Sequence, residues 1–405
     1  MNSSKRVLSI LALFEKRFSL AILRNFCSQK VFADLFGPIS EHYWADELEE
    51  AEKKGRIKEI QENSFIYEID PSFSSYLKEQ LACGFYEQER SLLKETWVKI
   101  YAGLSRQFLG HLQAGKTEAA INAAAVEEPN LLESLRWLTE VAQESRSIGF
   151  WGLAEVIFQY LESVYTLQNR PESIAPLRQT ILASVGTNAA QAEQAGGLGI
   201  WKRVVASELF DGYQQGMAAL EKKEWLPAAE RFQEAYQGFM KIENERQAAV
   251  CAHNLGMALT GEQEWPKAEA WCKTGLEICQ RISDVEGEAQ ALYQLGKISE
   301  KQERFDEADN FYQQAIEFRE RAGEPVQLIT AYAQYGRFSL RYQRWDASIT
   351  CQAKALSLAS QLGHEHYRNK ILKNLQNTKE LMTRLEGKTS FENHWQRLIK
   401  SAPPV

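Results

Sequence analysis

Residues 110–117 have the spacing of a loop that binds nucleotide phosphates. Their two glycines, Lys116 and Thr117 match the pattern G-x-x-x-x-G-K-[ST], in which backbone N–H groups and the lysine hold the phosphates. This chemistry needs a buried strand before the loop and a helix after it. Before Gly110 the apolar side chains show helical spacing instead, at positions 97, 98, 100, 101, 104, 108 and 109. We therefore interpret the segment as a turn between two helices, with an ATPase that depends on Lys116 as the alternative.

Histidine and cysteine residues show no metal-site spacing in the sequence. His364 and His366 are two residues apart and would point to different sides of a helix, whereas a zinc site takes three or four ligands. The six cysteines, at 27, 83, 251, 272, 279 and 351, have no C-x-x-C spacing, so we expect small buried side chains in a reducing compartment. No hydrolase or metalloprotease motif occurs. The sequence predicts neither a cofactor nor an enzyme.

The composition is that of a soluble globular chain. The 405 residues are 44 % hydrophobic and 25 % charged, with a net charge of −7. This charge argues against a chain that coats nucleic acid or acidic membranes. The apolar stretch 7–14 ends at Glu15, and no stretch approaches the roughly 18 apolar residues of a membrane span. We expect a cytoplasmic protein without a membrane contact.

The clearest pattern is an internal repeat of 40 residues. Glycines recur at 216, 256, 296 and 336. Each is followed nine residues later by an aromatic side chain, at 225, 265, 305 and 345, and three residues further by a small one, at 228, 268, 308 and 348. Another small residue follows seven positions on, at 235, 275, 315 and 355. Small residues let two helices approach closely, so the pattern predicts stacked pairs of antiparallel helices.

These residues resemble the tetratricopeptide repeat, over about residues 205–362. The usual period of that family is about 34 residues, so a period of 40 implies longer helices or longer turns. The resemblance implies an all-α fold, a superhelical solenoid of helix pairs, with residues 364–386 as a polar-faced capping helix. Weaker repetition around Gly115 and Trp151 precedes a break or hinge at 169–199.

The first hundred residues follow a different pattern. We expect two apolar helices within 5–28, divided at Ser19, and a third helix over 41–54 that ends at Gly55. Alternating residues in 56–69 predict one β-hairpin, and Pro71 opens another helix. Three helices and a hairpin resemble a winged helix. Together with the repeats they resemble the C-terminal half of STAND-class signalling ATPases, whose nucleotide-binding domain has no counterpart in this sequence.

The predicted organisation has four parts. A winged-helix-like domain covers 1–85, and a helical region with degenerate repeats covers 86–200. The repeat array with its capping helix covers 201–386, and a tail covers 387–405.

A winged helix could bind DNA, and residues 1–30 carry six basic residues against one acidic residue. The expected third helix is acidic, with carboxylates at 41, 46, 47, 49, 50 and 52, which would repel phosphates. We therefore favour a structural or protein-binding role for this region. A transcription factor whose solenoid senses a peptide is kept as an alternative.

The first helix of each repeat would line the concave face of the solenoid, where peptides or partner helices bind. Counted from the repeat glycines, the inward side chains are Tyr213, Met217, His253, Asn254, Met257, Tyr293, Gln294, Lys297, Gln334, Arg337 and Arg341. This lining becomes basic toward the C-terminus, and residues 337–373 hold seven basic against two acidic residues. The same side chains could instead pack between repeats.

The sequence as a whole predicts a non-catalytic scaffold or regulatory adaptor. Its partner would be another protein or peptide, and the basic end of the concave face, around Arg337, Arg341 and Arg344, would hold an acidic or C-terminal segment. A signalling component that works with a STAND-type ATPase is the remaining alternative.

Overall fold

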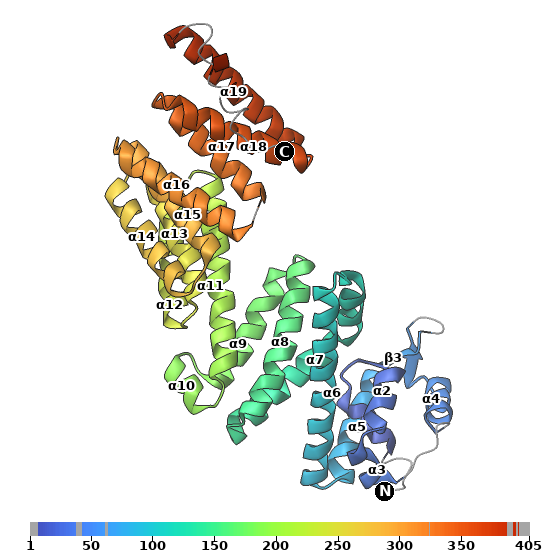
Figure 1. The fold of residues 1–405 in the computed structure, drawn as a ribbon. Coiled ribbons are helices and arrows are strands. Elements are labelled where there is room, and N and C mark those ends of the chain that lie inside the picture. Colours follow the sequence, from blue (N-terminus) through green and yellow to red (C-terminus); the bar gives the residue numbers. More distant parts are fainter. Residues whose placement is uncertain are drawn as a thin grey trace. The chain divides into compact units, whose positions relative to one another are not determined.

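The computed structural model describes residues 7–37, 43–60, 64–323 and 325–386, together with Glu392, Asn393 and Gln396. Eighteen α-helices, three short strands and two 3₁₀ helices lie in these ranges (Figure 1). The chain divides into two compact units, Met1–Val205 and Ala206–Val405. None of the helices in the described ranges combines the length and apolarity that a membrane span needs. The predicted all-α fold is confirmed.

The N-terminal region joins helices to a three-stranded antiparallel sheet. It runs through η1 (Ser9–Leu13), β1 (Arg17–Ser19), α2 (Leu20–Cys27), α3 (Lys30–Phe36), α4 (Tyr43–Lys53), β2 (Ile57–Glu59), β3 (Ile66–Ile69) and α5 (Pro71–Gly84). The strand order is β1-β3-β2. The predicted hairpin is confirmed, and the side chains of Ser19 and Asp70 cap α2 and α5. That this region is a winged helix stays a prediction.

Two expectations for this region are wrong. The segment before Ser19 is not a full helix but the 3₁₀ turn η1, and Arg17–Ser19 is a third strand because it pairs with β3 on the side opposite to β2. The short helix α3 was not expected, and it separates α2 from α4. The expected start of the third helix, at Glu41, lies outside the described residues.

Longer helices complete the first unit. They are α6 (Glu87–Gln113), α7 (Thr117–Ser145), α8 (Ile148–Leu167), α9 (Ile174–Val185) and α10 (Ala189–Gln194), with the 3₁₀ helix η2 (Pro171–Ser173). Asn130 of α7 connects them to the strand region, because its amide accepts from the N–H of Glu15 and donates to the carbonyl of Arg17, each at 2.8 Å. The expected break at 169–199 thus contains η2, α9 and α10, and α9 packs on α7 and α8.

The second unit is a regular series of antiparallel helices (Figure 1). After α11 (Leu198–Glu221) follow α12 (Trp225–Lys241), α13 (Glu245–Gly261), α14 (Trp265–Arg281), α15 (Val285–Lys301), α16 (Phe305–Ala322), α17 (Pro325–Arg341), α18 (Trp345–Gln361) and α19 (Glu365–Glu386). From α12 to α18, each helix has 17 residues except α16, which has 18. Longer helices therefore account for the 40-residue period.

Every turn in this series uses one residue in the left-handed conformation. These residues are 20 positions apart, with φ between 56° and 75°: Lys223, Glu243, Gln263, Ser283, Glu303, Gly323, Gln343 and Gly363. Such a residue just after a helix reverses the chain and satisfies its last carbonyl groups. Because every turn has the same backbone conformation, residues 40 positions apart occupy equivalent places in successive helix pairs. Only two of the eight turn residues are glycine.

The repeat glycines mark the points where two helices of one pair lie closest together. A Cβ atom added at Gly256 would lie 2.4 Å from the Sγ of Cys272, and one added at Gly296 would lie 2.9 Å from the ring of Tyr312. Gly216 and Gly336 face the residues at the equivalent positions, 232 and 352. The expected reason for the glycines, close helix approach, agrees with these contacts.

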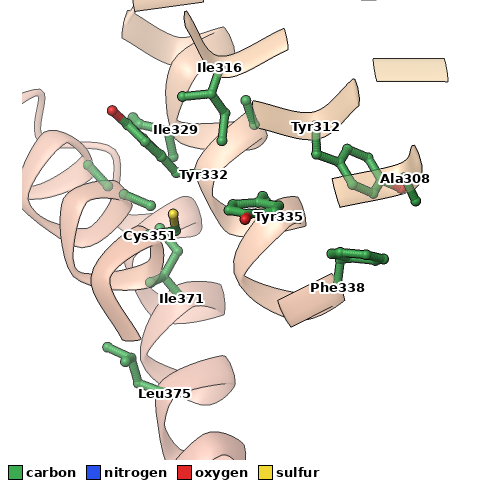
Figure 2. Packing of buried hydrophobic residues seen from close by; sticks show 13 residues of the cluster. Ala308, Tyr312, Ile316, Ile329, Tyr332, Tyr335, Phe338, Cys351, Ile371 and Leu375 are labelled. Atoms are coloured by element: carbon green, nitrogen blue, oxygen red, sulfur yellow. The ribbon is translucent and has the colours of Figure 1, made fainter. Parts of the chain in front are cut away.

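The C-terminal repeat and α19 share one apolar cluster (Figure 2). The rings of Tyr312, Tyr335 and Phe338 lie together, with centroids 5.1 to 6.3 Å apart. Ile371 and Leu375 of α19 belong to the same cluster, whereas most other described residues of α19 are exposed. This helix therefore has the apolar face and the polar face expected of a cap. The expected tail from Gly387 lies mostly outside the described residues.

The close approach at Gly256 predicts a stability difference between two glycines. Gly256→Ala should lower the free energy of unfolding by about 1–3 kcal/mol, because the added methyl group overlaps the Cys272 sulfur. Gly212→Ala, in α11 with nothing within 4 Å of the added Cβ, should raise it by roughly 0.5–1 kcal/mol. Urea denaturation followed by circular dichroism measures both. Equal stability of the wild type and Gly256→Ala would contradict the proposed close packing.

Candidate functional site

The first helices of four consecutive repeats, α11, α13, α15 and α17, carry the predicted inward residues. Equivalent positions are 40 residues apart, so His253 and Tyr293 correspond, as do Met257, Lys297 and Arg337. Of these first helices, α13 and α15 pack directly on each other. The repeat register therefore places side chains with the same offset from the glycine on one face of the second unit.

Two hollows meet at Tyr293 on this face. The first, of about 200 Å³, is lined by Tyr293, Lys297, Gln334, Arg337 and Arg341 among the predicted residues, together with Thr260, Glu300, Lys301, Tyr312 and Phe338. The second, of about 360 Å³, is lined by His253, Tyr293 and Gln294 among them, together with Gln290, Arg319, Gln327 and Thr330. Tyr293 and six more of the eleven predicted residues thus line these two hollows, although their binding role stays a prediction.

The remaining predicted residues take part mainly in packing. Asn254 is 7 % exposed, and its amide donates to the hydroxyl of Tyr213 at 3.2 Å and to the carbonyl of Val250 at 3.1 Å. Met217 packs against the apolar cluster around Phe232. Met257 is partly buried on α13 and lines neither hollow. For Tyr213, Met217 and Asn254, packing between repeats is therefore the better interpretation.

Arg319, which sequence reasoning missed, is the most unusual residue of the site. It comes from α16, a second helix, and only first helices were searched for inward side chains. Only 7 % of Arg319 is exposed, and its guanidinium carbon lies 5.4 Å from the centroid of the Tyr293 ring. The sequence did contain an indication of this residue. At the positions equivalent to 319, the other repeats hold the buried apolar residues Phe239, Cys279 and Ala359, so an arginine here is an exception.

Three basic side chains near Tyr293 have no acidic partner. The Lys297 Nζ atom lies 5.8 Å from the Tyr293 ring centroid, and burial lowers the pKa of both Lys297 and Arg319. Burial, with the charges of Lys297 and Arg319, lowers the pKa of His253 to about 4. Among the ion pairs of the described residues, none includes Lys297, Arg319 or His253. Lys297 and Arg319 therefore carry positive charge near Tyr293 without an ion pair among the described residues, although the charges of Glu300 and Glu286 partly offset it. His253, with its lowered pKa, is uncharged near pH 7.

The basic end expected from the sequence is weaker than its charge count indicated. Arg341 forms an ion pair with Glu300, and Arg344 forms ion pairs with Asp306 at 3.1 Å and Asp309 at 2.5 Å. Arg337 is exposed and donates to the side-chain oxygen of Gln334. Of the three arginines named from the sequence, Arg337 alone has no carboxylate partner in the described part of the chain.

The other motifs have the structures of helix ends and packing residues. Gly110 lies inside α6, and Gly115, with φ +75°, forms the turn before α7 begins at Thr117, which confirms the helical interpretation of this motif. His364 and His366 are exposed at the start of α19. Four cysteines are buried, but Cys83 is exposed and Cys27 only partly buried, so burial was wrongly predicted for these two. No cluster of potential metal ligands occurs within the described ranges.

Comparison with known proteins identifies the repeats. A family model described as "Tetratricopeptide repeat" matches residues 247–321. These residues therefore resemble the tetratricopeptide repeat, as the spacing of the repeat glycines predicted. The match includes α15 and most of α13 and α16, and therefore His253, Tyr293, Lys297 and Arg319. No curated protein matches the chain in a sequence search.

A search of solved structures gives partial matches at low sequence identity, of which three are described here. The apo form of RapI is 13 % identical, with a TM-score of 0.42 over 61 % of this chain and 83 % of that protein. A signal transduction ATPase with numerous domains and a tetratricopeptide repeat sensor, from Pyrococcus horikoshii, is 14 % identical (TM-score 0.41; 99 % of this chain, 57 % of that one). Aspartyl phosphate phosphatase F from Bacillus subtilis is 10 % identical (TM-score 0.40; 99 % and 94 %).

The lowered pKa of His253 predicts a pH-dependent loss of stability. Below about pH 6.5 the unfolded chain binds a proton at this histidine, whereas the folded chain does so only near pH 4. As pH falls through this window, the free energy of unfolding should therefore decrease by roughly 3 kcal/mol because of this one site. His253→Gln should reduce the difference in unfolding free energy between pH 7 and pH 4 by that amount.

Urea titrations at several pH values measure this effect, and His366→Gln, at an exposed histidine, is the matched control. If the free energy of unfolding of His253→Gln changed with pH as it does in the wild type and the control, this would contradict the burial of the imidazole beside two cations.

Proposed function

We propose that this protein is a non-catalytic interaction adaptor that binds an extended peptide segment of another protein. The segment would lie on the first-helix face of residues 205–345, with Tyr293 at its centre. Tetratricopeptide solenoids offer long surfaces built from equivalent helix positions, which suit an extended partner. The residues proposed as ligands come from α13, α15, α16 and α17.

Unpaired buried polar atoms carry this proposal. His253 Nδ1, Gln294 Oε1, Arg319 Nε and Gln327 Oε1 are buried and have no hydrogen-bond partner, and all four side chains line the second hollow. Buried polar groups are normally paired, so four such atoms in one place require an explanation. A peptide main chain supplies both donors and acceptors at regular spacing, and could therefore pair with this mixture.

Two observations favour this function over the alternatives. The motif at 110–117 begins within a helix, which does not fit the strand and loop that a nucleotide phosphate site needs. In the N-terminal region, the exposed residues of α4 include Asp46, Glu49 and Glu50, and Arg17 lies 3.7 Å from Glu68 in an ion pair. An acidic helix and a paired arginine are poorly suited to bind phosphates.

Panning a displayed library of random peptides on the full chain tests the proposal. Selected peptides should bind Tyr293→Ala at least tenfold more weakly than the wild type, a loss of about 1.4 kcal/mol, because this ring borders both hollows. Tyr86→Ala, at a tyrosine that is 81 % exposed in the first unit, should leave the affinity unchanged. Isothermal titration calorimetry gives the affinities. Failure to enrich any peptide, or equal affinity for both variants, would reject the proposal.

A further inference from the structure

We propose that the first unit binds a small aromatic carboxylate in a hollow lined by η1, α5, α6 and α7, which we call the Trp97 hollow. The ring of the ligand would lie against Trp97 and Trp137, with its carboxylate near Arg90 and Lys94. The site lies outside the repeats of the second unit, so this inference goes beyond the proposed function and does not depend on it.

The Trp97 hollow is large enough to hold a whole small molecule. Its volume is about 560 Å³, more than that of either hollow beside Tyr293. Its apolar lining includes both tryptophans, which are buried, together with Leu13, Leu81 and Val141. Sites for small molecules commonly have this size, with mostly apolar walls and a few polar groups that orient the ligand. The two indole rings favour an aromatic ligand, because aromatic rings attract one another beyond the gain from burial.

The α6 helix places two cations beside Trp97. Arg90, Lys94 and Trp97 are three or four positions apart, so they lie on successive turns of one face, and all three line the hollow. Lys94 is partly buried, and within the described ranges it has neither an ion pair nor a hydrogen bond. The Nη1 atom of Arg90 donates to the main-chain carbonyls of Ala82 and Phe85, at 2.6 and 2.8 Å. A ligand carboxylate near both side chains would form charge-assisted hydrogen bonds with them.

Two of the three acidic side chains that line the hollow already have basic partners. Glu15 pairs with Lys78 at 3.0 Å, and Glu133 pairs with Arg136. The third, Glu87, is exposed in the first turn of α6, where a negative charge suits the N-terminus of the helix. The seven charged lining residues carry a net charge of +1. The charge of the hollow therefore favours an anion over a neutral molecule or a cation.

Trp97 also has a hydrogen-bond donor without an acceptor. Its side chain is 3 % exposed, and its Nε1 atom is buried with no hydrogen-bond partner among the described residues. Buried donors are normally paired, so this one requires an explanation. An oxygen atom of a bound ligand could accept from it, which makes a carboxylate better suited to this hollow than a purely apolar molecule.

The test is an NMR titration of the full chain, with ¹⁵N in its tryptophan rings, by 2-naphthoate. The indole N–H signals of Trp97 and Trp137 should shift, whereas that of Trp345, a buried tryptophan of the second unit, should not. Variants with phenylalanine at each of these positions assign the signals. The neutral 2-naphthamide lacks the charge and acetate lacks the ring, so each should bind at least about tenfold more weakly than 2-naphthoate.

Two variants locate the ligand in the hollow. Lys94→Met removes the charge and keeps much of the side-chain length, so it should lower the affinity for 2-naphthoate roughly tenfold and leave that for 2-naphthamide unchanged. Ser91→Trp, at an exposed lining residue of α6, should fill the hollow and abolish binding of both compounds. Lys99→Met, at an exposed lysine of the same helix that pairs with Glu95, is the matched control and should change neither affinity.

Several results would overturn the proposed site. They are no shift of either indole signal, equal affinity for 2-naphthoate and 2-naphthamide, or an unchanged affinity for 2-naphthoate in Lys94→Met or Ser91→Trp. A shift of the Trp345 signal at the same concentration would indicate non-specific association and would reject the site as well. Circular dichroism of each variant separates a loss of binding from a loss of structure.

Discussion

The structure of the second unit depends on the close approach of two helices at each repeat glycine. At Gly256 and Gly296 the first helix lies so near its partner that no side chain fits between the backbone and the residue 16 positions on. Together with identical left-handed turns every 20 residues, this contact keeps all helices in one register. Residues 40 positions apart therefore lie on the same face, and a change of residue type at one position changes the surface locally without disturbing the stack.

The surroundings of Tyr293 are the result of two such changes. Position 297 is lysine where earlier repeats have methionine, and position 319 is arginine where the other repeats have buried apolar residues. Both cations lie within 6 Å of the Tyr293 ring centroid, a distance at which a cation and an aromatic face attract each other. The ring offsets part of the unfavourable burial, but it supplies no negative charge. Two cations thus lie beside one ring, and neither has an ion-pair partner among the described residues.

Local patterns in the sequence predicted most of the fold, and contacts between distant residues account for what they missed. The repeat glycines, the hairpin at 56–69 and the helix starts at Ser19 and Pro71 depend on residues close in sequence. Strand β1 was missed because its three residues become a strand only by pairing with β3, about 50 positions away. For the site, the repeat offset correctly grouped Tyr293, Lys297 and Arg337. It could not show that Glu300 pairs with Arg341, 41 residues on, or that Arg319 reaches the same ring from a second helix.

The protonation of Lys297 tests the central claim most directly. Its side-chain carbon next to the amine can be followed by ¹³C NMR in the full chain across a pH titration, and the signal can be assigned by its absence in Lys297→Met. The account predicts a pKa below that of an ordinary lysine in the free chain, because the amine is partly buried without an acidic partner. A pKa of about 10.4 or higher in the free chain would contradict a partly buried cation without an ion pair at this site.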